Sequence, residues 1–225
     1  MLDHCIWNAL STCQISFAEG DEFAKRFLPA VTTLAAIRDF SPESFRSLSR
    51  LMEPGGMGIF FLDAVPPLSA GWRVLREIPL AQMVWNGSVD IEDGNEVETL
   101  SLADVDEMLA LTELTKPGPF GKRTPELGTY LGIRDGRRLV AMAGERLQLP
   151  GFTEVSAVCT HPEFQGRGFA RRLITAVVRR IVERGETPFL HVARENVRAI
   201  RVYEELGFRT RILQTAFALR REGEV

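Results

Sequence analysis

A glycine-rich loop between a strand-like segment and an amphipathic helix limits the fold of this chain more than any other feature. Thr153 to Thr160 has the pattern of a strand, and Arg167 to Arg184 carries apolar residues at spacings of three and four. Glycines at a helix start let a ligand approach the backbone, where the first N–H groups have no partner within the helix. We therefore expect an anion such as a diphosphate to bind here, with Arg167 adding a charge-assisted bond. The loop consists of Gln165, Gly166, Arg167, Gly168, Phe169 and Ala170.

Two common phosphate-binding loops do not fit this pattern. The sequence has no GxxxxGK[ST] motif, and no acidic residue follows a second strand where a dinucleotide fold needs one. On its own the loop is equally consistent with an ordinary glycine-rich turn. If it binds a ligand, the pattern leaves a different nucleotide-derived cofactor.

The charge and the hydropathy exclude two classes of partner. The chain has 225 residues with a net charge of -3, and 45% of them are hydrophobic, which is typical of a soluble globular protein. A nucleic-acid binder needs a basic face, so we expect none, and we interpret the arginines of the 167–184 helix as a solvated surface. No run of about 18 apolar residues is present to span a membrane. We expect a cytoplasmic protein without a membrane partner.

The cysteines indicate neither disulfides nor a metal. Cys5, Cys13 and Cys159 are odd in number and form no CxxC pair. His4 with Cys5 and Cys13, or His161 with Cys159, could be imagined as ligands, but buried thiols and a loop histidine are the simpler interpretation. We expect no metal.

A polar, turn-rich stretch from Val84 to Glu98 divides the chain. We place a boundary near residue 94, between an N-terminal α/β segment of unknown role (1–94) and a second unit (95–225). Ser41 as N-cap and Pro42 at the first helical position predict a helix. For the first segment we expect helices at 21–28 and 41–52, and strands at 57–62, 72–78 and 80–85.

The second unit has a clearer pattern of elements. The pair Asp135-Gly136 predicts a hairpin turn, and Gly185 and Gly207 end two helices. The expected order is βαβββαβαβ. Strands are expected at 97–102, 128–134, 138–148, 153–160, 187–193 and 211–220, and helices at 103–115, 167–184 and 195–206.

Two motifs of this unit resemble the GNAT superfamily of N-acetyltransferases. The loop matches the family pattern [Q/R]xxGx[G/A], and a second match follows about thirty residues later in "NVRAIRVYEELGF". The resemblance covers roughly residues 95 to 220. It implies a GNAT α/β fold, whose mixed central sheet splays open between the strand ending at Thr160 and the strand beginning at Thr187. The matching residues are Gln165, Gly168, Ala170, Asn196, Ala199, Tyr203, Gly207 and Phe208.

The resemblance also implies acetyl-coenzyme A as co-substrate. The backbone of Val158, Cys159 and Thr160 would pair with the pantetheine amides, and the glycine-rich loop would hold the pyrophosphate. Asn196 would bond the cofactor near its pantetheine end, with Ala199 beside it. Tyr203 matches the tyrosine that protonates the leaving sulfur in many relatives, or else it anchors its helix. A phenol with an ordinary pKa near 10 is protonated at neutral pH, as such an acid must be.

The resemblance further points to Glu154 as the general base. It lies eleven residues before Gln165, the offset at which histone-acetylating members place theirs. Its apolar sequence neighbours would raise its pKa toward the working range of a base, although the position could equally face solvent. Glu145 and Glu113 are competitors, and some relatives use water chains. The N–H of Val158 would serve as an oxyanion donor.

The acceptor is expected to be a small amine or an amino acid, as in the glycine N-acyltransferase-like branch, with acetylation of a protein amine left open. The loop from Lys116 to Leu127 would line its site, and Phe120, Trp72 and Trp85 are either walls of that site or ordinary packing residues. The alternative function is a non-catalytic module that senses acyl-CoA. A homodimer also remains open.

Overall fold

A computed structural model describes residues 1–87 and 97–223. Its main feature is an eight-stranded mixed sheet in the order β4-β11-β5-β10-β9-β8-β7-β6. All neighbours are antiparallel except β9 and β10, which run parallel. The boundary predicted near residue 94 lies outside the described residues. The strands are β4 (Met57–Leu62), β5 (Trp72–Trp85), β6 (Glu98–Leu100), β7 (Tyr130–Asp135), β8 (Arg138–Leu149), β9 (Phe152–Thr160), β10 (Thr187–Ala193) and β11 (Phe208–Arg221).

The sheet splays between β9 and β10. Pairing runs from Thr187 opposite Phe152 to Phe189 opposite Glu154, and the register ends there although both strands continue. On its other side β9 shifts register against β8 between Ser156 and Cys159. Ala157, inside that irregularity, has φ of +50°. The splay expected at this place in the sheet is therefore present.

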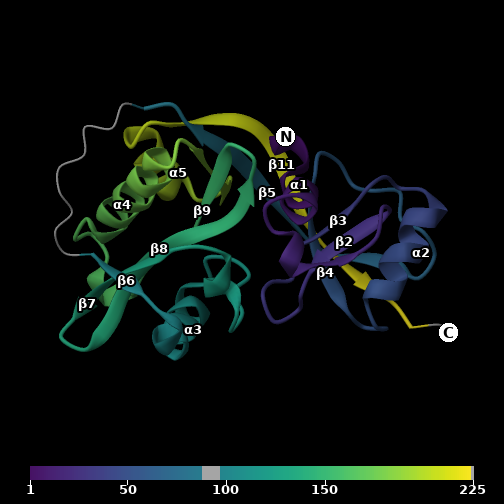
Figure 1. Cartoon of the computed structure of the whole chain (residues 1–225), viewed down its shortest axis with the longest axis horizontal. Coiled ribbons are helices and arrows are strands. Elements are labelled where there is room, and N and C mark those ends of the chain that lie inside the picture. Colours follow the sequence, from purple (N-terminus) through teal and green to yellow (C-terminus); the bar gives the residue numbers. More distant parts are fainter. Residues whose placement is uncertain (88–96, 224–225) are drawn as a thin grey trace.

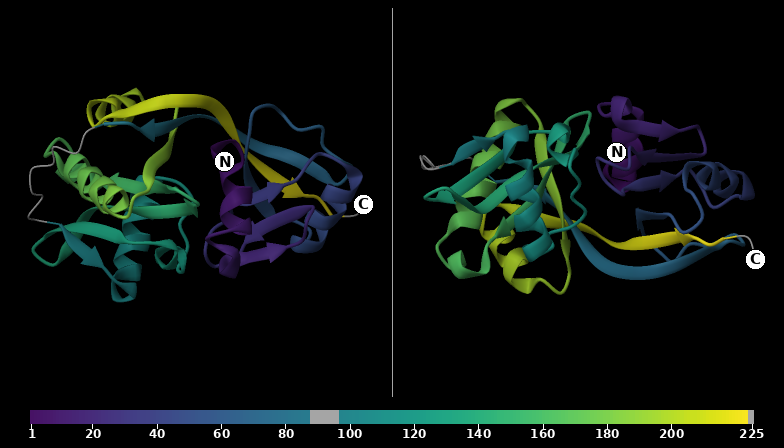
Figure 2. Two further views of the ribbon diagram at one scale, coloured as in Figure 1. Left: turned by 45° about the horizontal axis from the view of Figure 1, so that its top comes forward. Right: turned by 90° about the horizontal axis from the view of Figure 1, so that it is seen from below.

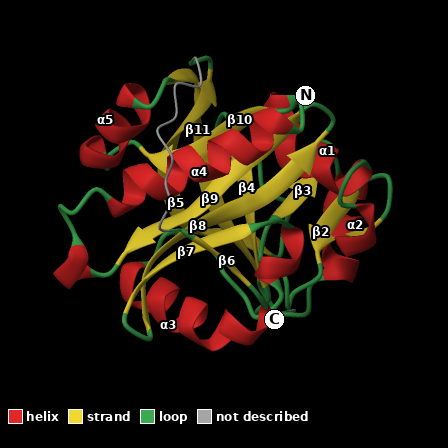
Figure 3. Ribbon diagram, turned by 60° about the vertical axis from the view of Figure 1, so that its left-hand side comes forward, coloured by secondary structure: helices red, strands yellow, loops and turns green. Residues whose placement is uncertain are grey.

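Helices cover both faces of this part of the sheet (Figure 3). The helix α4 (Phe169–Glu183) buries its apolar stripe against the side chains of β8 and β9 that include Ala141 and Val155. The opposite face, with Met142 and Cys159, packs with α3 (Val105–Thr115). α5 (Val197–Glu205) precedes β11. Every helix and strand predicted after residue 96 is present, with ends shifted by a few residues.

The N-terminal part contains a three-stranded antiparallel sheet, β1 (Ala18–Gly20), β2 (Ala24–Phe27) and β3 (Ala35–Ile37), with α1 (Cys5–Ser11) and α2 (Pro42–Leu51). Ser41 caps α2 by accepting from the N–H of Ser44, which confirms that helix. The helix predicted at 21–28 is wrong, because β2 occupies this stretch. Asp21 accepts from the N–H groups of Phe23 and Ala24, so it closes the turn between β1 and β2 instead of starting a helix.

Two long strands, β5 and β11, join the halves of the molecule (Figures 1 and 2). They pair from Phe208 opposite Trp85 to Arg221 opposite Trp72. Two separate strands were predicted around Pro79, but β5 is continuous. The carbonyl of Pro79 accepts from the N–H of Arg194 where the ladder with β10 ends, so the missing N–H of Pro79 breaks no pair in the middle of the sheet. Among the described residues, no helix is long and apolar enough to cross a membrane.

Candidate functional site

The glycine-rich loop opens directly onto the N-terminus of α4. Gly166 and Gly168 have φ of +81° and +78°, and a Cβ built on either would meet no atom within 4 Å. The first i→i−4 bond of the helix runs from Arg172 to Gly168, at 3.1 Å. The N–H groups before Arg172 therefore have no partner within the helix, and they point the positive end of its dipole toward open space. This geometry fits a diphosphate.

Exposed cations lie beside this loop. The Arg167 guanidinium lies 4.7 Å from the ring centre of Phe164, which holds it next to the loop. Gln165 accepts a bond of 3.5 Å from Arg198 at the start of α5. The loop thus combines backbone donors with two positive side chains, and two segments far apart in sequence supply them.

The splayed strand β9 carries the residues predicted to face pantetheine. Cys159 is buried, and Val158 and Thr160 are partly buried. Burial raises the pKa of the Cys159 thiol to about 11, which keeps the thiol neutral near pH 7. The buried hydroxyl oxygen of Thr160 has no hydrogen-bond partner. A polar backbone or amide group in the gap would give this oxygen a partner.

Tyr203 lies where α5 meets the core behind β9. Its side chain is buried, and its ring centre lies 5.8 Å from that of Phe208. Burial raises the pKa of Tyr203, with a further contribution from Cys159, so the phenol stays protonated through the neutral range. At the start of the same helix, the oxygen of Asn196 accepts from the N–H of Ala199 at 3.1 Å. Asn196 is therefore the N-cap of α5.

Glu154 has an environment that its sequence neighbours do not indicate. Arg146 binds both of its oxygens, with bonds of 2.8 Å and 2.7 Å, and His191 Nδ1 lies 2.7 Å from Oε1. Burial alone would raise the pKa of Glu154, but the charge and hydrogen bonds of Arg146, together with His191, lower it to about 2. The expected rise in this pKa is thus wrong, because the two partners come from the neighbouring strands β8 and β10.

Sequence reasoning missed Arg146 and His191. The hairpin at Pro150-Gly151 indicates only that Arg146 lies near Glu154 on the neighbouring strand, because Leu149 pairs with Phe152 and an even register would place Leu147 opposite Glu154. A register shift between Glu145 and Gln148 brings Arg146 there instead. No comparable local signal marks His191, which reaches Glu154 only through the parallel pairing of β10 with β9.

The contacts of Glu154 continue as a chain of polar side chains across the sheet, which we call the polar row. His191 Nε2 lies 3.1 Å from Gln82 Nε2, and Gln82 Oε1 accepts from Arg211 at 2.8 Å. Arg211 pairs with Asp3 just before α1. The strands that contribute, β11, β5, β10, β9 and β8, are consecutive in the sheet. The polar row consists of Asp3, Arg211, Gln82, His191, Glu154 and Arg146.

The competing carboxylates differ in burial. Glu145 is buried and pairs with Arg184 at 3.0 Å, on the opposite side of the strand from Arg146. It also accepts a bond of 3.4 Å from the N–H of Thr129. Glu113 is exposed on α3. Neither residue joins the polar row.

The three aromatic residues considered as acceptor walls lie in different places. Phe120 packs edge-on against Tyr130, with 5.6 Å between ring centres, on the α3 face of the sheet. Trp72 packs with the N-terminal cluster near α2, and Trp85 donates to the carbonyl of Leu206 at 2.9 Å. The structure therefore brings only Phe120, of these three, to the splayed end of β9.

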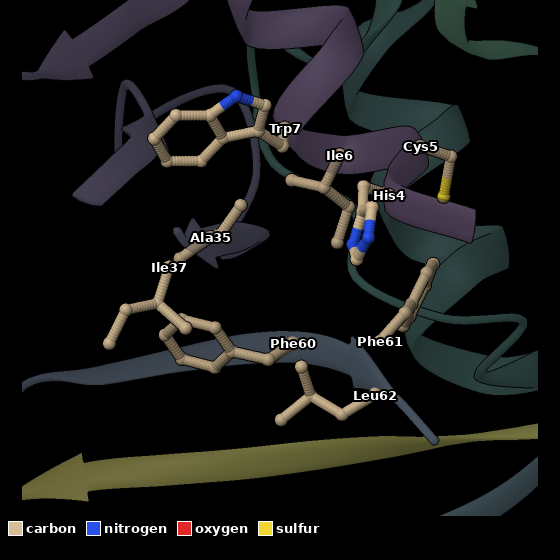
Figure 4. A pocket seen from close by; sticks show the side chains of 10 residues that line it. His4, Cys5, Ile6, Trp7, Ala35, Ile37, Phe60, Phe61 and Leu62 are labelled. Atoms are coloured by element: carbon tan, nitrogen blue, oxygen red, sulfur yellow. The ribbon is translucent and has the colours of Figure 1, made fainter. Parts of the chain in front are cut away.

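A small cavity of about 30 Å³ lies between α1, β3 and β4 (Figure 4). Its lining is mostly apolar, with His4 at one side. Phe61, which lines it, lies 4.5 Å from the ring of His191 between ring centres. The cavity thus borders the polar row on the side covered by the N-terminal part. Its lining residues include Cys5, Ile6, Trp7, Ile37, Phe60 and Leu62.

Comparison with known proteins gives consistent matches. A model of the FR47-like protein family matches residues 130–218. A crystal structure from Novosphingobium aromaticivorans, placed in the GNAT family of acetyltransferases, is 39% identical, with a TM-score of 0.90 over 99% of both chains. A GCN5-related N-acetyltransferase from Kribbella flavida is 17% identical with a TM-score of 0.65, and it shares the fold.

Curated relatives match a shorter region. A mycothiol acetyltransferase of Mycobacterium leprae is 40% identical over 78 residues, which is 32% of this chain and 25% of the relative. The N-alpha-acetyltransferase RimI of Mycobacterium tuberculosis is 38% identical over 82 residues, covering 35% of this chain and 51% of the relative. The matched region thus spans a quarter of the first of these relatives and about half of the second.

Proposed function

Because the chain belongs to the GNAT family of acetyltransferases, we propose that it transfers an acetyl group from acetyl-coenzyme A to an amine by direct attack. One observation carries the proposal: the splay between β9 and β10 lies next to the open N-terminus of α4. A cofactor with a long arm and a diphosphate needs a gap in the sheet for its arm and an anion site for its diphosphate. The relatives named for mycothiol and N-alpha acetylation support an amine acceptor.

We expect the residues that would hold the co-substrate to follow one path. The N–H groups of the loop from Gln165 to Ala170, with Arg167, would bind the pyrophosphate. The backbone of Val158, Cys159 and Thr160 would pair with the pantetheine amides in the splay. Asn196 and Ala199 would contact the arm from the start of α5. The thioester would then lie beside Tyr203.

Tyr203 would act as the acid. When bound, acetyl-coenzyme A supplies an activated acyl group whose departing thiolate needs a proton or a hydrogen bond. The buried phenol of Tyr203 is protonated because its pKa is raised, and it lies close enough to Cys159 of β9 for the two groups to interact electrostatically. The N–H of Val158 would stabilise the oxyanion.

The contacts of Glu154 bear on its expected role as general base. Glu154 as general base stays a prediction, but Arg146 and His191 occupy its oxygens and lower its pKa to about 2. A carboxylate held in this way is a weak proton acceptor, so we propose that it fixes Arg146 in place. Removal of the amine proton then falls to water, which members of this family also use according to the resemblance.

A two-part assay tests the proposal against a module that only senses acyl-CoA. Calorimetric titration with acetyl-coenzyme A measures binding, and release of free thiol with a panel of primary amines and amino acids measures transfer. We expect binding together with thiol release that depends on the amine. Binding without transfer to any amine supports the sensing module, and absence of binding contradicts both functions.

A further inference from the structure

One nitrogen of the Arg146 guanidinium is unused. Glu154 accepts from Nε and Nη2, while no hydrogen bond among the described residues involves Nη1. The side chain is only 9% exposed. A Cβ built on Gly118 would lie 3.9 Å from Nη1, so this nitrogen points to the loop between α3 and β7 that was expected to line the acceptor site. Nη1 is not among the buried side-chain atoms that lack a partner, so this end of the guanidinium keeps contact with solvent and stays open to a ligand.

A second unused donor lies on the same face of the sheet. Tyr130 is 2% exposed, and its hydroxyl oxygen has no hydrogen-bond partner. Its ring crosses β8 over Gly144, where an added Cβ would lie 2.4 Å from the ring. Burial raises the pKa of Tyr130, and the nearby charge of Arg146 opposes this rise, which places the two side chains within electrostatic reach.

These two donors lie beside the splayed part of β9. Gly144, under the Tyr130 ring, pairs with Ser156, two residues beyond the last position at which β9 pairs with β10. Tyr130 and Cys159 belong to one buried cluster on the α3 face, which is opposite to α4. Phe120 closes this cluster from the loop side. An acceptor that attacks a thioester in the splay from the α3 face therefore passes Tyr130 and Arg146.

We propose that Arg146 Nη1 and the Tyr130 hydroxyl bind an oxygen next to the reacting amine of the acceptor, either a carboxylate or an amide carbonyl. The acceptor is then an α-amino compound. This inference rests on the proposed function and narrows its substrate. The guanidinium can only donate, and the Tyr130 hydroxyl can donate to the same atom, so the two groups together select an acceptor oxygen. Because the Arg146–Glu154 pair is neutral as a whole, it recognises the oxygen by hydrogen bonds and does not require a full negative charge.

The polar row explains why Arg146 suits this role. His191 contacts Glu154 directly, and Gln82, Arg211 and Asp3 continue the polar row behind His191. Gln14, from the N-terminal part, donates to the backbone carbonyl of Arg146 at 2.7 Å. A guanidinium held by two bonds to Glu154, on a backbone held by Gln14, loses little side-chain freedom when it binds a ligand. Its free nitrogen is therefore pre-oriented toward the acceptor.

The test uses matched acceptors with saturating acetyl-coenzyme A. Glycine, glycinamide and methylamine form one series, and phenylalanine, phenylalaninamide and phenethylamine form another. We expect kcat/KM to be about tenfold or more higher for the oxygen-bearing members, because unpaired buried donors penalise an acceptor that lacks the oxygen. Tyr130→Phe should remove most of this preference, because kcat/KM for the oxygen-bearing members falls toward that of the simple amines. Equal use of all three members by the wild-type protein overturns the inference and leaves the proposed function intact.

Thermal unfolding separates binding from folding in this test. Tyr130→Phe deletes a hydroxyl without a partner, so the unliganded variant should melt at the same or a higher temperature. Phe120→Leu is the matched control, because it alters packing against Tyr130 without deleting a donor and should keep the preference for oxygen. A preference that survives in Tyr130→Phe overturns the inference.

A binding readout covers the case in which no amine is acetylated. N-acetylglycine and N-methylacetamide, the products of glycine and methylamine, are titrated by calorimetry into protein saturated with coenzyme A. Tighter binding of N-acetylglycine by the wild-type protein, reduced in Tyr130→Phe, supports the subsite even if the proposed transfer fails. Equal or undetectable binding of both compounds overturns it.

Discussion

The two tyrosines of the chain, Tyr130 and Tyr203, are both buried phenols on opposite sides of the sheet. We propose that Tyr203 protonates the leaving thiolate and that Tyr130 binds the acceptor, and kinetic measurements can separate these two roles. In Tyr203→Phe we expect kcat to fall by about 100-fold, the usual size of a general-acid contribution, with little change in the affinity for acetyl-coenzyme A. Thiol release under saturating conditions measures this. Unchanged kcat would show that Tyr203 only anchors α5.

The lowered pKa of Glu154 predicts how the stability of the folded protein depends on pH. Its pKa in the folded protein, about 2, lies below the ordinary value of 4.5. The folded state therefore gains stability from ionised Glu154 at pH above 4.5, and this gain is lost as the pH falls toward 2. In Glu154→Gln the Arg146 charge stays buried without its partner, and we expect a loss of about 3–5 kcal/mol at pH 7.

Urea unfolding at several pH values measures this effect. The wild-type protein should lose stability between pH 4.5 and pH 2, and the variant should lose less over the same interval because it lacks the titrating group. Glu163→Gln, which alters an exposed carboxylate, should behave as the wild type. A variant with wild-type stability at pH 7 would contradict the tight pairing with Arg146.

At the scale of the element, α4 offers a matched pair of glycines. Gly168 precedes the helix and Gly185 follows it, with φ of +78° and +77°, and a Cβ on either would meet open space. Each change to alanine should cost about 1–2 kcal/mol, because the left-handed conformation strains any residue with a Cβ. In Gly168→Ala alone, we expect the dissociation constant of acetyl-coenzyme A to rise by about tenfold, since the methyl group enters the anion site.

Calorimetric titration and thermal unfolding of both variants check this prediction. Equal loss of stability with unequal loss of affinity supports an anion site at the start of the helix. If Gly185→Ala weakens binding as much as Gly168→Ala, the effect comes from strain in the helix and the loop has no direct role.

Elements with strong local signals were predictable from the sequence. α4 combines a glycine at each end with an apolar stripe, and the loop before it was found for the same reason. The helix expected at 21–28 is absent because Asp21 accepts from the N–H groups of Phe23 and Ala24 and closes the turn between β1 and β2. The partners of Glu154 could not be found from neighbours in sequence, because strand pairing brings His191 to it from another part of the chain.

For the whole molecule, the pairing of β5 leads to a prediction about the domain boundary expected near residue 94. This strand precedes that boundary, yet it pairs with β10 on one side and β11 on the other. A fragment of residues 95–225 would lack it and expose the edges of both neighbours. We expect this fragment to be unfolded or aggregated, as measured by circular dichroism and size-exclusion chromatography. A monomeric fragment that folds and binds acetyl-coenzyme A would establish the second unit as an independent domain.

The pairing of β4 with β11 has a consequence for the order in which a ribosome makes this protein. Residues 57–62 leave the ribosome well before their partners, Thr215 to Arg220, are made. Until then β4 lacks β11, its neighbour in the large sheet as far as the structure describes the chain. This edge of β4 therefore stays open while residues 63–214 are made, and open strand edges attract aggregation or a chaperone.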